Sequence, residues 1–179
     1  MKAILVFLSL VLASCATTLP HEPTGDHDTL VVGEISLHAE HFNQFGAATV
    51  NGDHSAGIIV TVLQVDSDKE FTVVTVGDRG LFSFPAVVGV EYQIIKLDYT
   101  NQSGGATAQL VGTPDRLRFR APADGVSSLG AIVWSADDKR RYYAKTGANP
   151  AHDVKADVLK QYPKTKWIDA PWASVTWIN

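Results

Sequence analysis

Three arginines at alternate positions form the pattern in this chain that is best suited to contacting a charged partner. They are Arg116, Arg118 and Arg120, and Leu117 and Phe119 stand between them. Alternate side chains of a strand share one face, so the guanidinium groups would make a basic stripe suited to phosphate or carboxylate. The simpler explanation is a solvent-exposed strand whose charges keep the protein soluble and discourage pairing with another strand at the sheet edge. We keep the stripe as a candidate contact surface for anionic lipid or glycan.

Three of the four tryptophans lie close to the C-terminus, at Trp167, Trp172 and Trp177. Exposed rings of this kind can stack on sugars because they combine a flat apolar surface with a polar group. Large aromatic residues more often close a core or fill a seam between helix and sheet. We therefore expect at least two of the three to be structural, and we retain all three as candidate contact residues.

Two short segments contain the residue types of metal sites and catalytic triads. The sequence H-A-E-H at residues 38–41 has two residues between its histidines, whereas the zinc-protease motif has three, so a surface loop is favoured. Asp53, His54 and Ser55 are adjacent, but a triad joins separated parts of a fold so that each group can hydrogen-bond to the next. A turn is the better interpretation of these three residues.

Other sequence motifs that could support catalysis or metal binding are weak or missing. The acidic residues Asp66, Asp68 and Glu70 lack the glycine and the spacing of an EF-hand loop and indicate a hairpin tip. The chain has no glycine-rich phosphate loop and no nucleophile elbow. We expect no catalytic residue, no metal and no cofactor. A metal-dependent hydrolase that brings together His38, His41 and His54 is the less favoured alternative.

The single cysteine, Cys15, directly follows an apolar N-terminal segment. Lys2 and the apolar run over residues 3–12 have the plan of a secretory signal, and the run is shorter than the roughly 20 residues of a membrane span. The sequence L-A-S-C that ends at Cys15 resembles the lipobox of bacterial lipoproteins. The alternative is an ordinary signal peptide with an incidental cysteine.

The lipobox resemblance implies cleavage after residue 14 and attachment of acyl chains such as palmitate to Cys15. More than one chain would anchor the protein firmly in a membrane. In lipoproteins an aspartate after the cysteine tends to retain the product at the inner membrane, and this chain has Ala16 there. The resemblance therefore implies lipid anchoring at the outer membrane, facing the periplasm or the cell surface. Residues 15–28 are polar, contain Pro20 and Pro23, and predict a flexible linker.

The composition of the whole chain limits the class of protein. Fifteen basic and 19 acidic residues give a formal charge of -4, so the basic excess of a nucleic-acid binder is missing and no nucleic-acid partner is expected. A single cysteine allows no internal disulfide, so a hydrophobic core must hold the fold. The length that follows residue 14 suits one domain.

Short runs rich in valine, isoleucine, phenylalanine and tyrosine alternate with clusters of glycine, aspartate and asparagine from residue 29 onward. This pattern predicts an all-β protein over residues 29–146, either a sandwich or a barrel. The strands are predicted at residues 30–38, 57–65, 70–76, 81–84, 91–99, 107–111, 116–121, 127–135 and 140–145. The run at 70–76 is apolar on both faces, which predicts a central strand.

Residues 147–179 are predicted to form a C-terminal helix and a tryptophan-rich extension packed on the sandwich. Asn149 can cap a helix and Pro150 suits its first position. Apolar residues then follow at helical spacing, namely Val154, Val158, Leu159 and Tyr162. Residues 172–179 are expected to close the domain as a strand or an extended segment.

Residues 57–97 resemble the carboxypeptidase-regulatory-like domain, a small transthyretin-like β-sandwich. In that family a strand leads through a D-x-x-G-x-F-x-F turn to a glycine, a tyrosine and a further strand. The matching residues are Asp78, Gly80, Phe82, Phe84, Pro85, Gly89 and Tyr92. The chain departs from the family in having two residues between Gly89 and Tyr92, and Val88 where a proline is expected. The resemblance implies an antiparallel β-sandwich of transthyretin-like or immunoglobulin-like type, and members of the family are typically non-catalytic modules.

The sequence therefore predicts a non-catalytic, lipid-anchored envelope protein whose sandwich binds another envelope component, either a protein or a polysaccharide. A surface-anchored carbohydrate-binding module that uses the late tryptophans is one alternative. An accessory lipoprotein of a secretion apparatus is another, by analogy of fold alone.

Overall fold

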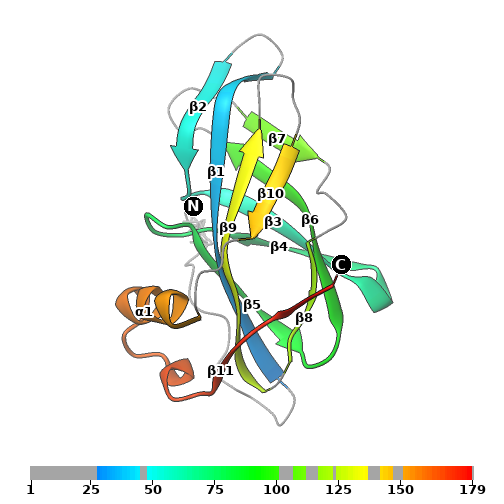
Figure 1. Cartoon of the computed structure of the whole chain (residues 1–179), viewed down its shortest axis with the longest axis vertical. Coiled ribbons are helices and arrows are strands. Elements are labelled where there is room, and N and C mark those ends of the chain that lie inside the picture. Colours follow the sequence, from blue (N-terminus) through cyan, green and yellow to red (C-terminus); the bar gives the residue numbers. More distant parts are fainter. Residues whose placement is uncertain are drawn as a thin grey trace, which may run out of the picture.

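The computed structural model describes residues 28–44, 48–100, 107–111, 117–122, 124–136, 142–146 and 151–178. The predicted signal segment, Cys15, most of the linker and Arg116 lie outside these residues. Within them the chain forms two β-sheets that pack on each other and one α-helix near the C-terminus (Figure 1). The predicted all-β sandwich with a C-terminal helix is confirmed.

The first sheet is organised around two long neighbouring strands that run parallel to each other, β1 and β9, and its other strands pair with one of these two. β1 is long enough to pair with β5 along its first part and with β2 along its second part. Its other edge pairs with β9 from Thr29 to Ala39. The strands of this sheet are β1 (Asp28–Gln44), β2 (Ala48–His54), β5 (Leu81–Val87), β9 (Gly125–Ala136), β10 (Tyr142–Thr146) and β11 (Trp172–Ser174).

The second sheet is antiparallel and has the strand order β12-β8-β6-β3-β4, with β7 paired to β6. A 3-10 turn (Val65–Ser67) joins β3 to β4, and Asp68 after it has a left-handed backbone with φ 51°. This hairpin tip is the turn that the acidic residues predicted. The strands are β3 (Ile58–Gln64), β4 (Lys69–Val74), β6 (Glu91–Thr100), β7 (Thr107–Val111), β8 (Arg118–Arg120) and β12 (Thr176–Ile178).

Aromatic rings fill one part of the main core between the sheets. The ring of Phe84 lies 5.8 Å from that of Tyr92, and Tyr92 stacks on Phe119 at 6.0 Å between centroids. All three side chains are buried. Burying one such side chain contributes about 1.5–3 kcal/mol, so this cluster joins β5 of the first sheet to β6 and β8 of the second.

A second apolar cluster lies between the first sheet and α1 (Ala151–Gln161). Val154 and Val158 of the helix pack against Leu30 and Val32 of β1 and against Val126 of β9. The helix thus buries Val154 and Val158 of the predicted stripe, with Tyr162 partly buried against the same cluster, and it covers the face of the sheet opposite the main core. After it come a 3-10 turn (Lys166–Ile168) and the short strands β11 and β12, which join different sheets.

Residues 39–54 differ from the expectation of loops and turns. The H-A-E-H segment lies within β1 rather than in a loop, and Asp53 and His54 end β2 rather than forming a turn. From Leu37 to Ala39, β1 pairs with β2 on one side and with β9 on the other, and from Phe42 onward it pairs with β2 alone among the described strands. Backbone pairing with a neighbouring strand therefore holds a polar segment in extended form against its local composition.

Candidate functional site

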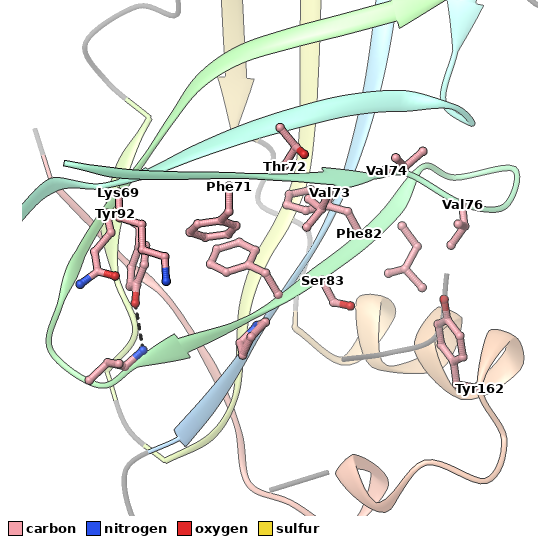
Figure 2. A pocket seen from close by; sticks show the side chains of 15 residues that line it. Lys69, Phe71, Thr72, Val73, Val74, Val76, Phe82, Ser83, Tyr92 and Tyr162 are labelled. Carbon is pink, nitrogen blue, oxygen red and sulfur yellow. Dashed lines mark hydrogen bonds between the residues drawn. The ribbon is translucent and has the colours of Figure 1, made fainter. Parts of the chain in front are cut away.

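An apolar groove of about 540 Å³ opens between β4 and β5 (Figure 2). These two strands belong to different sheets, and each lies at a sheet edge: among the described strands, β4 pairs with β3 and β5 pairs with β1. The groove is therefore a gap in the side of the sandwich, at a place where neither sheet continues. Its volume lies within the range of roughly 300–1,000 Å³ that is typical of binding sites in proteins.

The groove exists because the end of β4 is joined to the start of β5, and the two strands diverge from this junction. Val76, just beyond β4, exchanges two backbone hydrogen bonds with Leu81, at 2.8 and 2.9 Å. Residues 77–80 make the turn between them. From this junction β4 runs along β3 in one sheet and β5 runs along β1 in the other, so the two strands diverge (Figure 2). The sheets are joined at one end of the groove and open at the other.

The floor of the groove is aromatic. Phe71 points from β4 toward β5, while Thr72 points to the opposite side of the strand (Figure 2). The ring of Phe71 lies 5.0 Å from Phe84 and 6.4 Å from Tyr92. Phe71 is only half-buried, although both of its neighbours are buried. One ring of the core cluster therefore keeps a face that a bound molecule could cover.

Few polar groups reach the groove. The hydroxyl of Tyr92 accepts a hydrogen bond from the backbone N–H of Val87 at 3.0 Å. Burial raises the pKa of this phenol above its usual value of 10.0, so Tyr92 is neutral at physiological pH. Of the lining residues only Lys69 carries a charge, and it lies at the Tyr92 end. The lining thus provides hydrocarbon, a few hydroxyl and amide groups and one cation.

The groove is not evident from the sequence, because the apolar pattern of residues 70–76 predicts a central strand. That prediction was wrong, since β4 is an edge strand of its sheet. The inner face, with Phe71 and Val73, lines the groove, and Val74 on the outer face is 43% exposed. An apolar pattern on both faces indicates either a central strand or an edge strand that awaits a partner, and the pattern alone does not separate the two.

A second pocket, of about 500 Å³, is polar and lies beside residues from β1, β2 and β9 and the turn that precedes β5. Its most unusual member is Glu34, whose side chain is 3% exposed. Arg79 donates a hydrogen bond from Nη2 to Oε2 of Glu34 at 2.9 Å, and its Nε lies 3.4 Å from Oδ2 of Asp157. Arg79 therefore joins a carboxyl of β1 to one of α1.

Burial raises the pKa of Glu34 to about 7, and hydrogen bonding and charge repulsion from Asp157 act in the same direction, while Arg79 partly opposes them. A carboxyl whose pKa is higher in the folded state than in the unfolded state stabilises the fold while it is protonated. This contribution is complete below about pH 4.5 and is lost as the pH rises through about 7.

We expect the unfolding free energy of the wild-type chain to fall by on the order of 2 kcal/mol between pH 4.5 and 8, and Glu34→Gln to remove most of this dependence. Urea unfolding across this pH range measures it. Glu70→Gln is the matched control, because Glu70 is exposed on β4, and it should keep the wild-type profile. A profile that is the same in wild type and Glu34→Gln would contradict this role.

The predicted arginine stripe is paired with an acid on the neighbouring strand. Nε of Arg118 lies 3.0 Å from Oε1 of Glu91, and Nη2 of Arg120 lies 3.1 Å from Oε2 of the same carboxylate. The two arginine side chains remain 39% and 53% exposed. Glu91 thus offsets part of the charge of the stripe. Arg116 lies outside the described residues, so the stripe as a whole stays a prediction.

The three late tryptophans do not share one surface. Trp167 is 3% exposed and belongs to the cluster under α1, so its assignment as a contact residue was wrong. Trp172 donates its indole N–H to the carbonyl of Trp167 at 3.2 Å, and Nζ of Lys155 lies 5.5 Å above its ring. Trp177 packs edge-on against Phe119 in the main core. These rings close the seams of the fold.

The histidines contact separate partners. Nδ1 of His38 lies 2.6 Å from Oδ1 of Asp53, across the pairing of β1 with β2. His54 stacks on Tyr99 and is hydrogen-bonded to its hydroxyl at 3.0 Å. The side chain of His41 lies outside the described residues. Among the side chains that the structure describes, no three histidine, cysteine or acidic residues form a group able to hold a metal ion.

Comparisons of the chain with protein-family models, with curated proteins and with solved structures found no significant match. In the described part of the chain, no helix combines the length and the hydropathy that crossing a bilayer requires. The fold and the groove show the class of protein at the level of structure: an all-β sandwich with one covering helix and an apolar groove at its side. The resemblance to the carboxypeptidase-regulatory-like domain stays a prediction.

Proposed function

We propose that this chain is a non-catalytic, lipid-anchored envelope protein that holds a segment of a partner protein in the groove between β4 and β5. The observation that carries this proposal is the groove itself, an apolar gap between two sheet edges with a half-buried aromatic floor. The lipobox-like sequence that ends at Cys15 supports the anchor and the location at the outer membrane. Such a protein would act as a tethered adaptor.

The chemistry of the groove favours a protein partner over a polysaccharide. Sugars present hydroxyl groups on nearly every ring carbon, and their binding sites match these with polar side chains beside exposed aromatic platforms. Here the lining is mostly valine, leucine and phenylalanine, with one charged residue, Lys69. The tryptophans that could have served as sugar platforms pack within the fold. Apolar side chains of a protein segment fit this lining better.

Crosslinking inside living cells tests this proposal. A photoreactive amino acid in place of Val73, which lines the groove, should give a discrete adduct that protease digestion removes. The same amino acid in place of Lys164, exposed beyond the end of α1, is the control and should give no such adduct. An adduct common to both positions, none at Val73, or one that resists protease would contradict a protein partner in the groove.

A further inference from the structure

The direction of the backbone groups along β4 can be followed from its hydrogen bonds. Thr75 directs both its N–H and its carbonyl toward β3, where they pair with Ile58 and Gly57, and the next residue, Val76, directs both toward Leu81. Successive residues of a strand direct these groups to opposite sides. Counting back from Val76, the N–H and carbonyl groups of Glu70, Thr72 and Val74 therefore point to the free edge of β4.

The facing edge of β5 is blocked by its own residues. The backbone groups of Leu81 point toward Val76. By the same alternation, the residues of β5 whose backbone groups point to the groove are Ser83, Pro85 and Val87. Pro85 has no N–H to donate. The N–H of Val87 is already donated to the hydroxyl of Tyr92. Proline on an edge strand is a common protection against pairing with another chain.

The edge of β4 has no comparable protection. Its only charged residues, Lys69 and Glu70, stand at its first two positions, and neither proline nor glycine interrupts the strand. Among the described strands nothing pairs with this edge. Val74 beside it is 43% exposed. An apolar edge strand left open in this way is a template for a further strand.

We infer that β4 accepts one extended segment of a partner protein as an additional strand of the second sheet, and that the inward side chains of this segment fill the groove. The inference rests on the proposed function and names the form of its partner. Alternating N–H and carbonyl groups are satisfied by another polypeptide backbone and not by an acyl chain. This is the mode of recognition in which main-chain bonds supply affinity and pockets for alternate side chains supply specificity.

The lining of the groove also predicts a sequence pattern for the bound segment. A strand paired with β4 would lie about 4.8 Å from it. Because successive side chains of a strand point to opposite faces, every second side chain of the segment would point inward, over Phe71 and Val73. The segment should therefore carry apolar residues at alternate positions. Lys69 is the one charged residue of the lining and has no ion pair among the described residues. A carboxylate at the end of the segment that lies beside Lys69 complements this charge.

The chain's own N-terminal segment is a poor occupant by composition. β1 begins at Asp28, which pairs with Val87 at the end of β5, so the described part of the chain begins close to the open end of the groove. The stretch over residues 16–27 contains Pro20 and Pro23, which lack N–H groups, and only two apolar residues, Ala16 and Leu19. It offers no alternating apolar pattern. A segment of another protein matches the groove better.

The test compares two substitutions of Thr72. Thr72→Pro removes an N–H that points to the free edge while leaving the bonds to β3 intact, and the extended backbone of Phe71 tolerates a following proline. Thr72→Ala shortens the same side chain and keeps the N–H. Random 12-residue peptides displayed on phage are selected on the lipid-free mature chain carrying Cys15→Ala, and the most enriched peptide is used as a fluorescent probe.

We expect enriched peptides with alternating apolar residues and an acidic residue at one end. The probe should bind Thr72→Ala as it binds the parent and bind Thr72→Pro at least tenfold more weakly. Amide hydrogen exchange of the parent, which does not depend on any variant folding, should show new protection at Glu70, Thr72 and Val74 on addition of the probe, and none at Ser83.

The inference would be overturned if no peptide is enriched, if both Thr72 variants bind the probe equally, or if the new protection lies on β5 instead of β4. It would also be overturned if the parent chain forms a homodimer that Thr72→Pro disrupts, because a second copy of the chain would then be the occupant. If palmitate binds and peptides do not, an acyl chain is the occupant. A cellular adduct at position 73 that persists in Thr72→Pro would leave the proposed function standing and remove strand addition alone.

Discussion

Replacing Gly80 with alanine is expected to leave the domain largely unfolded. Gly80 ends the turn between β4 and β5 with φ +69°, and a β-carbon there would lie 2.0 Å from the carbonyl oxygen of Ile35 and 2.8 Å from that of Ser55. Both obstacles are backbone atoms. To relieve these two clashes, β1 would have to move away from the turn. This movement would break the hydrogen bond in which the N–H of Ile35 donates to the carbonyl of Gly80 at 3.0 Å.

We expect this change to cost more than about 4 kcal/mol, a large part of the roughly 5–15 kcal/mol by which a domain is stable. Gly57→Ala is the matched control, because Gly57 also has a left-handed backbone, with φ +76°, but a β-carbon there would have no atom within 4 Å beyond its chain neighbours. It should cost only the backbone preference, about 1–2 kcal/mol. Denaturant unfolding of both variants measures the difference, and equal losses would show that close approach is unimportant.

Replacing Cys15 with alanine is expected to abolish the lipid attachment that we propose. Cys15 is the only cysteine, so the chain offers no other thiol for an acyl chain. Growth with radiolabelled palmitate should label the wild-type protein, and Cys15→Ala should carry less than about a tenth of that label. The reason is covalent: without sulfur no thioether to diacylglycerol can form, and each buried methylene of the lost chains would have contributed about 0.8 kcal/mol to membrane binding.

Ser14→Ala is the control for the lipid experiment, because it keeps a small residue directly before Cys15 and should retain the label. Mass spectrometry of the mature N-terminus gives a second measurement. An unlabelled wild-type protein, or a mature chain that begins at a residue other than Cys15, would show that the signal is an ordinary one. The domain would then be free of a lipid anchor, although the groove would be unchanged.

Much of the sandwich could be predicted because its strands are encoded by local patterns. The alternation of Leu117 and Phe119 with arginines placed one strand at residues 116–121, and the structure has β8 within that range. The stripe of Val154 and Val158 predicted the helix and the face that it buries. In both cases the burial of one face requires a periodicity that can be read from the residues alone.

The strand β2 and the second part of β1 were missed for the opposite reason. Residues 39–54 have few apolar residues in alternation, and their extended form depends on the pairing of β1 with β2, while the part of β1 up to Ala39 pairs with β9. The parallel pairing of β1 with β9 joins residues about 96 positions apart, as in the bond from Thr29 to Gly125. Such pairing leaves no local trace.

The residues themselves establish that this chain has a signal-like start, one cysteine, strands of predictable position and one amphipathic helix, because each of these features depends on neighbours within a few positions. Which strands end up at an edge depends on how the two sheets assemble. β4 is open, β5 is blocked by Pro85 and by the hydroxyl of Tyr92, and the groove lies between them. Whether an apolar face meets a neighbour or an empty edge is settled by contacts between segments far apart in the chain.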